Sequence, residues 1–391
     1  MSSGEQHTPE ASATFSQSTE LLGAIKPISE QQPQENPTPT SEEEVVERTK
    51  TLAERHPDWP PITVQIFLSG HDTPGDLADL AELIPRSDIY LYESGTGDKF
   101  TRAFQALANE DLSPSRIEEV LEQSKGIRGT AWEAIVRGVQ GSKAIVGHID
   151  LRPGDEVDGM EISDKYNATF SAPVDYNDFN GDLQSLEVGA AELAALQSKR
   201  EHEMPLRFET ELEKIFSDHP ELKQKENLNI LQSMGSYHTG LKRAFTDAGV
   251  KAEHILHHSP YIYSYRYQMQ REFAFGRQPD KDVVAKVLLE NVLEDALEHS
   301  AVQGDPLGHE ESVPYIRKIA SAFTTEEIES FYNQVGSKLS ERPQAEPDGE
   351  DERKAWAKSA VVALLNDQLS AKDMPPLPQS TDEIRQSITA S

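Results

Sequence analysis

Short apolar runs alternate with amphipathic segments along the first two thirds of the chain. The runs are rich in β-branched and aromatic residues and end in Gly, Ser, Asp or Glu, which predicts buried strands. Between them, apolar residues recur at helical spacing, which predicts helices. This alternation indicates an α/β fold with a mostly parallel central sheet flanked by helices. The four predicted strands cover Ile62–Leu68, Asp88–Tyr92, Lys143–Ile149 and Asn229–Met234.

The remaining patterns divide the chain into regions. Residues 1–40 and the end of the chain are rich in Ser, Gln, Glu and Pro, which predicts a disordered head and a disordered tail. A short helix and a Pro-rich linker are expected at 41–60, and the α/β domain at 61–275. An α-helical C-terminal region is expected at 276–340, followed at 341–391 by an acidic linker, one more helix and the tail.

Three segments are harder to interpret from their pattern. Arg152–Asn180 is rich in Gly, Pro, Asp and Asn, which predicts a long excursion. Leu183–Phe216 has a helical period that we expect Pro205 to interrupt. The tyrosines of Tyr261–Tyr267 alternate with other residues, which predicts a strand with one aromatic face that packs in the core or at an interface.

Charge and composition exclude several classes of protein. The chain has 37 basic and 68 acidic residues and a formal net charge of −31, which argues against nucleic acid and against anionic membrane surfaces as partners. It has no cysteine, so disulfides, thiolate metal sites and a cysteine nucleophile are excluded. The first residues do not resemble a signal peptide and no apolar run is long enough to span a membrane. We expect a soluble, cytoplasmic protein, with the head or the helical C-terminal region available to a protein partner.

Polar residues follow each predicted strand. His71, Glu93, Asp150 and His238 come after the first, second, third and fourth strand. Because the carboxyl ends of parallel strands open onto one crevice, these side chains are candidates for a shared site. Two imidazoles and carboxylates are typical ligands of a catalytic divalent metal ion of unknown identity. Polar residues also end strands simply as turn formers, and the spacing leaves both interpretations open.

Weaker candidates lie elsewhere. His254, His257 and His258 have the spacing of one helix face and could bind a metal, although surface positions are more common for such residues. The run of Glu201, His202 and Glu203 is typical of a solvated helix face.

Three of the strand ends carry motifs that resemble a known superfamily. They read FLSGH at 67–71, SDIYLYE at 87–93 and GSYHTGL at 235–241. Over about residues 62–250 the chain is similar to the TraB/PrgY–Tiki superfamily, to which ChaN-like proteins and erythromycin esterases are related. The resemblance implies metal-dependent hydrolysis of a peptide or ester bond, with His71, Glu93 and His238 at the site. Glu93 would be either a metal ligand or the general base.

The first motif departs from the family pattern, because Ser69-Gly70-His71 follows Leu68 and the usual first glycine of GxxH is missing. The alternative function is therefore a catalytically inactive binding or regulatory protein on the same scaffold.

Overall fold

The computed structural model describes the greater part of the chain after residue 50. The described residues are 51–69, 74–93, 98–109, 113, 115, 130–150, 159–171, 174, 176–235, 237–256, 264–300, 306–341, 350–378, 380, 383 and 384. The predicted disordered head lies outside them, as does His71.

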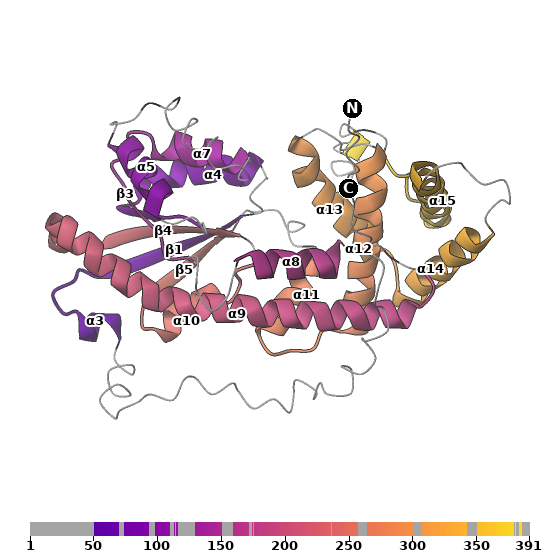
Figure 1. Ribbon diagram of the computed structural model, residues 1–391, viewed down its shortest axis with the longest axis horizontal. Coiled ribbons are helices and arrows are strands. Elements are labelled where there is room, and N and C mark those ends of the chain that lie inside the picture. Colours follow the sequence, from indigo (N-terminus) through magenta and orange to yellow (C-terminus); the bar gives the residue numbers. More distant parts are fainter. Residues whose placement is uncertain are drawn as a thin grey trace, which may run out of the picture. The chain divides into compact units, whose positions relative to one another are not determined.

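A five-stranded sheet forms the centre of the α/β part (Figure 1). All of its strand pairs are parallel, and the strand order is β3-β2-β4-β1-β5. The four predicted strands are present, and the fold class is confirmed. The pattern missed β5, which begins two residues after Gly249. The strands are β1 (Ile62–Ser69), β2 (Ile89–Leu91), β3 (Ile145–Gly147), β4 (Leu228–Gly235) and β5 (Lys251–Leu256).

Helices cover both faces of this sheet. Phe67 of β1 packs with Tyr90 and Leu231 against one helical layer, and we call this cluster the α4-side core. Its helices are α4 (Pro74–Leu83), the 3-10 turn η2 (Ile84–Arg86), α5 (Asp98–Ala108) and α7 (Thr130–Val139). Because successive side chains of a strand point to opposite faces, Val64 and Ile66 point the other way. They belong to the α9-side core.

The second layer consists of α9 (Phe179–Asp218) and α10 (Leu241–Asp247), with α3 (Leu52–Arg55) and the 3-10 turn η3 (Pro220–Gln224) nearby. A capping box of Thr51 and Glu54 begins α3, which explains why so short a helix forms there.

The order of the strands creates a switch point at the carboxyl edge of the sheet. The connection that leaves β2 runs through the α4-side layer to β3, whereas the one that leaves β4 runs through α10 on the opposite face to β5. In open parallel sheets the crevice between two such neighbouring strands is where ligands bind. Glu93 follows β2, and His238 follows β4.

Helix α9 is continuous for 40 residues, so the expected interruption at Pro205 is wrong. Pro205 lacks the N–H that a helix interior uses, a defect that usually kinks or ends a helix. Here Met204 and Phe208, on either side of it, are buried in the α9-side core, and this packing holds the helix to the sheet. The excursion expected before α9 is also partly wrong, because it contains the helix α8 (Gly159–Phe170).

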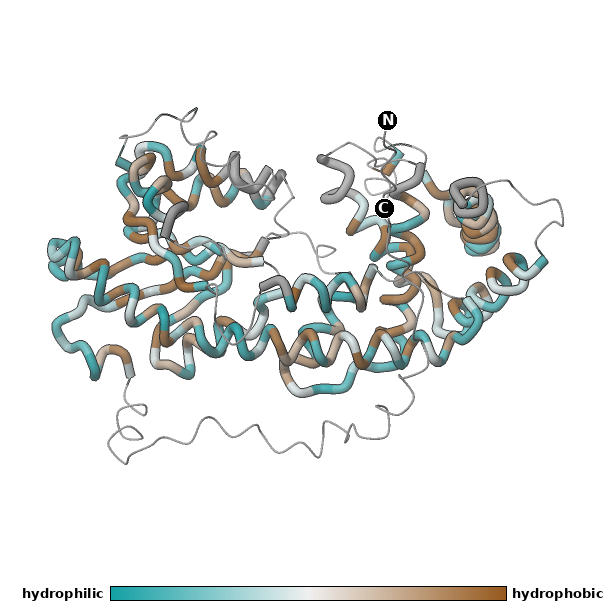
Figure 2. The backbone as a smooth tube through the Cα atoms, viewed as in Figure 1, coloured by the Kyte–Doolittle hydropathy of each residue, from teal (hydrophilic) through white to brown (hydrophobic). Residues whose placement is uncertain are grey.

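The C-terminal region is α-helical, as the pattern predicts. Its hydrophobic cluster, the helical core, includes Val284, Leu288 and Leu293 of α12, on which hydrophobic and hydrophilic residues alternate (Figure 2). A capping box of Thr324 and Glu327 begins α14. The helices are α11 (Tyr265–Ala274), α12 (Lys281–Ser300), α13 (Pro306–Ser321), α14 (Thr325–Ser340) and α15 (Glu350–Ala371).

One expectation for this region fails. Tyr265 and Tyr267 lie in α11, so the aromatic strand expected there is wrong for the described part of the run. In the tail, Leu377 and Ile384 are buried in the helical core, and the backbone N–H of Leu377 donates to Oδ1 of Asn366 at 2.7 Å. The described part of the tail is therefore packed, and residues 385–391 lie outside the description. Within the described helices, none is long and apolar enough to cross a membrane.

Candidate functional site

The carboxylate of Glu93 is held by donors from three elements. It stands two residues after β2, and its Oε2 accepts the backbone N–H of Gly235 at the end of β4, at 2.5 Å. Its Oε1 accepts Nη2 of Arg200 on α9 at 2.9 Å and lies 3.4 Å from Nε2 of His238. The Glu93 side chain keeps 19% of its surface exposed, against 11% for Arg200, so Glu93 is the more accessible of the two to solvent.

Arg200 joins Glu93 to Asp150. Its Nε and Nη2 donate to the two carboxylate oxygens of Asp150 at 2.8 and 2.5 Å, a bidentate geometry that gives strong charge-assisted hydrogen bonds. Burial lowers the pKa of Arg200, but the carboxylates of Glu93 and Asp150 outweigh it, so the pKa lies above its usual range. Asp150, only 1% exposed, also has its backbone oxygen bound by Arg207. Its side chain therefore anchors Arg200.

His238 lies between two carboxylates. Its Nε2 faces Glu93 and its Nδ1 faces Oε1 of Glu201, each at 3.4 Å. The backbone N–H of His238 donates to the carbonyl of Gly235, which closes the turn that points the ring inward. Burial and the charge of Arg200 lower the pKa of His238, but Glu201 and Glu93 together outweigh them and raise it above 6.5. His238 is 1% exposed, and within the described residues Glu93 is the more exposed group that its Nε2 faces.

Side chains of three residues hold Tyr237, the residue before His238, in place. The hydroxyl of Tyr237 donates to that of Tyr166 on α8 at 3.1 Å, and Nη1 of Arg266 on α11 donates to the same Tyr166 oxygen at 2.8 Å. The ring of Tyr237 also packs on Tyr267, with centroids 4.4 Å apart. Burial, helped by the neighbouring tyrosines, raises the pKa of Tyr237 well above its usual value of 10, so it stays neutral. The helical part of the chain therefore holds the loop that carries His238.

The structure brings together three of the four residues expected from the strand ends. Glu93 and His238 are in contact, and Asp150 joins them through Arg200. His71 lies outside the described residues; Ser69, two positions before it, pairs with Gly235.

No group of three side chains that could hold a metal ion occurs in the described part of the chain, and the metal site stays a prediction. The helical metal face expected from His254 is wrong, because His254 lies in β5; His257 and His258 are not described.

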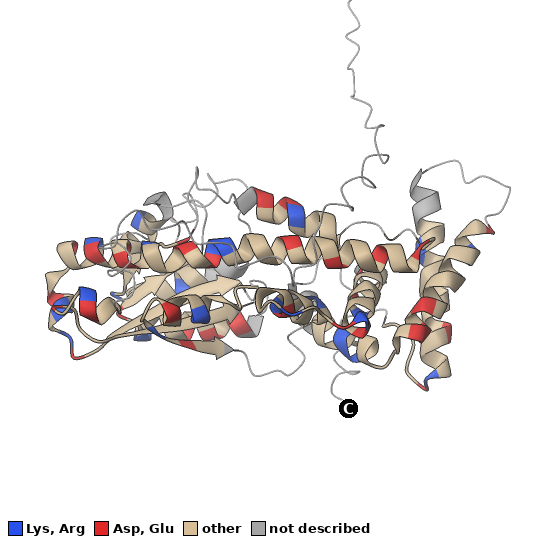
Figure 3. Cartoon of the chain, turned by 90° about the horizontal axis from the view of Figure 1, so that it is seen from below, with Lys and Arg blue, Asp and Glu red and all other residues tan. Residues whose placement is uncertain are grey.

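Two residues of the site, Arg200 and Glu201, were missed by sequence reasoning. Glu201 was assigned to a solvated face, yet it is only 5% exposed. A signal was present: the buried stripe of α9 runs through Leu193, and Met204 and Phe208 continue it beyond the charged pair. Charges occur all along α9 (Figure 3), but these two stand on the stripe itself.

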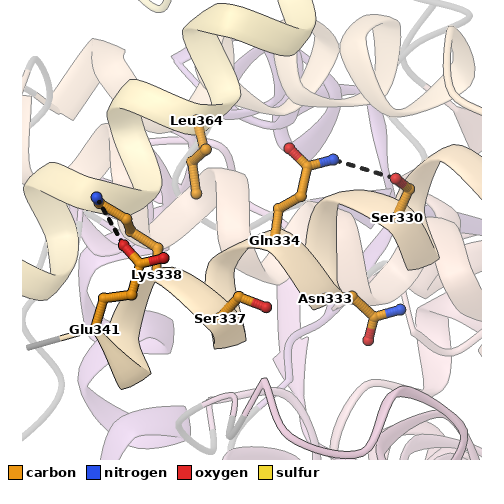
Figure 4. A pocket seen from close by; sticks show the side chains of 7 residues that line it. All are labelled: Ser330, Asn333, Gln334, Ser337, Lys338, Glu341 and Leu364. Carbon is orange, nitrogen blue, oxygen red and sulfur yellow. Dashed lines mark hydrogen bonds and ion pairs between the residues drawn. The ribbon is translucent and has the colours of Figure 1, made fainter.

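A groove lies between α14 and α15, away from this site (Figure 4). Gln334 donates to Ser330 and Lys338 pairs with Glu341 along its α14 wall, while Leu364 lines the α15 side. The ion pair is more than half exposed on both side chains, so water screens it and nothing there sets up chemistry.

Comparison with known proteins adds no assignment to this geometry. No protein-family model matches the chain, and neither a curated protein nor a solved structure shows significant similarity to it.

Proposed function

We propose that this chain is a hydrolase that cleaves an ester or peptide bond, with Glu93 as the reacting side chain. The observation that carries the proposal is the convergence of Gly235, Arg200 and His238 on one partly exposed carboxylate. That carboxylate stands between β2 and β4, at the switch point of a parallel sheet.

In this proposal Glu93 is a general base. It takes a proton from a water molecule as the water oxygen attacks the substrate carbonyl carbon, and the proton then passes to the leaving group. The Gly235 N–H and Arg200 fix the direction of the carboxylate. His238 stands behind Glu93 as a buried proton donor to Oε1, an arrangement in which each group orients the next.

The superfamily resemblance implies a divalent metal, which the described residues alone do not accommodate. Both oxygens of Glu93 already accept donors, and the described groups next to the two ring nitrogens of His238 are carboxylates. A metal site would need His71 and a displaced Arg200. The contacts therefore favour the general base over the metal ligand as the role of Glu93, and no step above uses a metal.

The test is a hydrolysis screen with the purified full-length chain. Activated esters and fluorogenic peptides are assayed after chelation and again with added manganese, zinc or cobalt. We expect activity that survives chelation and that falls by about 10²- to 10⁴-fold in Glu93→Gln, the range of a general-base contribution. Glu203→Gln, an exposed glutamate of α9, is the matched control and keeps full activity. Activity that Glu93→Gln retains would overturn the proposal. Activity that needs metal and disappears in His238→Ala would restore the metal mechanism.

A second candidate is a catalytically inactive binding protein on the same scaffold. The observation that favours it is that the polar groups of the site are bound to one another. Arg200 and Asp150 form two hydrogen bonds with each other, and His238 is almost inaccessible to solvent. The partner would be a protein bound by the helical C-terminal region, and both candidates include the cytoplasmic location expected from the sequence. In this case Glu93→Gln lowers stability and changes no activity in the screen.

A further inference from the structure

Two buried polar atoms face each other across the back of the site. Nδ1 of His238 and Oε1 of Glu201 are 3.4 Å apart. Both atoms are inaccessible to solvent, and neither forms a hydrogen bond with another described residue. Buried polar groups in folded proteins are almost always satisfied, so each of these atoms requires a partner. The only charged neighbour that the ion-pair geometry gives to Nδ1 is Glu201 itself, within the described residues.

Gly240 makes the approach of Glu201 possible. A Cβ atom at position 240 would overlap Oε2 of Glu201. The backbone of Gly240 has φ −83° and ψ −15°, a helical conformation open to any residue, so its chain geometry does not demand glycine. Position 240 requires a residue without a side chain because Oε2 of Glu201 occupies the space that a Cβ would take.

Glu201 also sits on a rigid support. It follows Arg200 directly on α9, and Met204, one turn further, is buried in the α9-side core. The two neighbouring side chains therefore reach the site from one fixed helix, Arg200 toward Glu93 and Glu201 toward His238. A carboxylate behind an imidazole fixes the ring orientation and the nitrogen that carries the proton, which is how working histidines are usually held.

We propose that Glu201 is the positioning residue of His238, and that Gly240 is glycine in order to admit it. Glu201 accepts the Nδ1–H of the protonated His238 ring and turns its Nε2–H toward Glu93. The inference rests on the proposed function only in taking His238 as part of the working site; the geometry that it explains stands without any reaction.

The test is a spectroscopic comparison at one fixed pH near 7. The full-length, chelated chain is labelled with ¹⁵N-histidine, and the ring signals of His238 are assigned as those lost in His238→Gln. We expect the Nδ1 signal of the wild type to be that of a protonated nitrogen. In Glu201→Gln it moves to the unprotonated range, because the glutamine amide can donate to Nδ1. Glu203→Gln, the exposed control on the same helix, leaves the signal in place.

Gly240→Ala provides an independent arm. The added methyl displaces the Glu201 carboxylate, so the His238 signal shifts while the charge of the protein is unchanged. If Glu201→Gln does not fold, this variant and Glu201→Asp carry the test. Unchanged Nδ1 signals in the folded variants overturn the inference.

The outcomes separate this inference from the proposed function. Where hydrolysis is found, Glu201→Gln lowers kcat by roughly 10- to 100-fold, with KM nearly unchanged, as expected for a group that orients another. Shifted signals without any hydrolysis support the positioning role and refute the hydrolase. Hydrolysis that depends on Glu93, together with unshifted His238 signals in Glu201→Gln, supports the hydrolase and refutes the positioning role of Glu201.

Discussion

The sharpest structural prediction concerns Arg200→Met. Methionine matches the length and much of the volume of the aliphatic part of arginine but removes the guanidinium. The loss leaves Asp150, which is 1% exposed, without the two charge-assisted hydrogen bonds that Arg200 donates to it. Glu93 loses one donor as well, but it keeps the Gly235 N–H and partial access to water. The cost of the substitution therefore arises mainly at Asp150.

Removing one partner of a buried ion pair costs about 3–5 kcal/mol, because the other charge stays buried. A chain of this size loses about 2 °C of melting temperature per kcal/mol, so Arg200→Met should melt roughly 6–10 °C lower. Asp150→Asn added to Arg200→Met removes the buried charge that has lost these two hydrogen bonds. We expect the double variant to recover about 1–3 kcal/mol of the free energy of unfolding relative to Arg200→Met, the coupling energy typical of residues in direct contact.

The assay is denaturant unfolding of the four proteins in this cycle, supported by melting curves. Arg86→Met is the matched control, because Arg86 pairs with Glu82 on the surface, where both side chains are more than two thirds exposed. Its cost should stay below about 1 kcal/mol. If Arg200→Met lowers the free energy of unfolding by no more than Arg86→Met does, Asp150 is not a buried charge that depends on Arg200. That result would refute the description of the site.

Three further predictions concern the helical part of the chain. Burial raises the pKa of Glu290 to about 7 from 4.5, so the folded protein binds a proton that the unfolded chain has released. The free energy of unfolding should therefore fall as pH rises from about 4.5 to about 7, by up to ~1.4 kcal/mol per unit, and Glu290→Gln should lose this slope in denaturant titrations. Gly336→Ala should cost about 1–3 kcal/mol in the same assay, because a Cβ there overlaps the carbonyl oxygen of Tyr176. Ile384→Ala should cost about 2–5 kcal/mol, because Ile384 is fully buried in the helical core.

Each of these has a clear contrary result. A Glu290→Gln protein with the pH slope of the wild type would show that the carboxyl is solvated. A neutral Gly336→Ala would mean that α14 moves freely away from Tyr176. An Ile384→Ala protein with wild-type stability would contradict the packing of Ile384 in the helical core.

The strands were predictable because a strand buried on both faces leaves a local signature. β1 is such a strand, with Ile66 in one core and Phe67 in the other, and its run is apolar almost throughout. β5 breaks that rule. Among the described strands it pairs with β1 alone, and Lys251 and Glu253 on it are exposed, so its sequence does not differ from that of a loop. The strand order also leaves no local trace, because it depends on which helical layer each connection enters.

The candidate site was predictable only as far as it is made of strand ends. Glu93 and His238 follow apolar runs, and parallel pairing brings such ends to one edge. Arg200 and Glu201 come from a helix that crosses this edge, 50 residues after Asp150 in the case of Arg200. No spacing in the sequence encodes that crossing. The only local indication in the sequence is a pair of charged residues at positions where the helix otherwise buries apolar side chains. This pattern indicates a buried polar site only when the partners of the two charges are known.

That crossing also explains how the α/β sheet and the helical region are joined at the candidate site. The first half of α9, with Leu183 and Leu193, packs in the helical core, and the second half, with Phe208 and Ile215, packs in the α9-side core. Arg200 and Glu201 fall between the two halves, after Leu193 of the helical core and before Met204 of the α9-side core. Two charges placed there must find partners, and the partners within reach are the polar strand ends. Tyr166 and Arg266 hold the His238 loop from the helical side as well. Because α9 is continuous and the helical region contacts the His238 loop directly, we expect a change in the helical region to alter the geometry around Glu93.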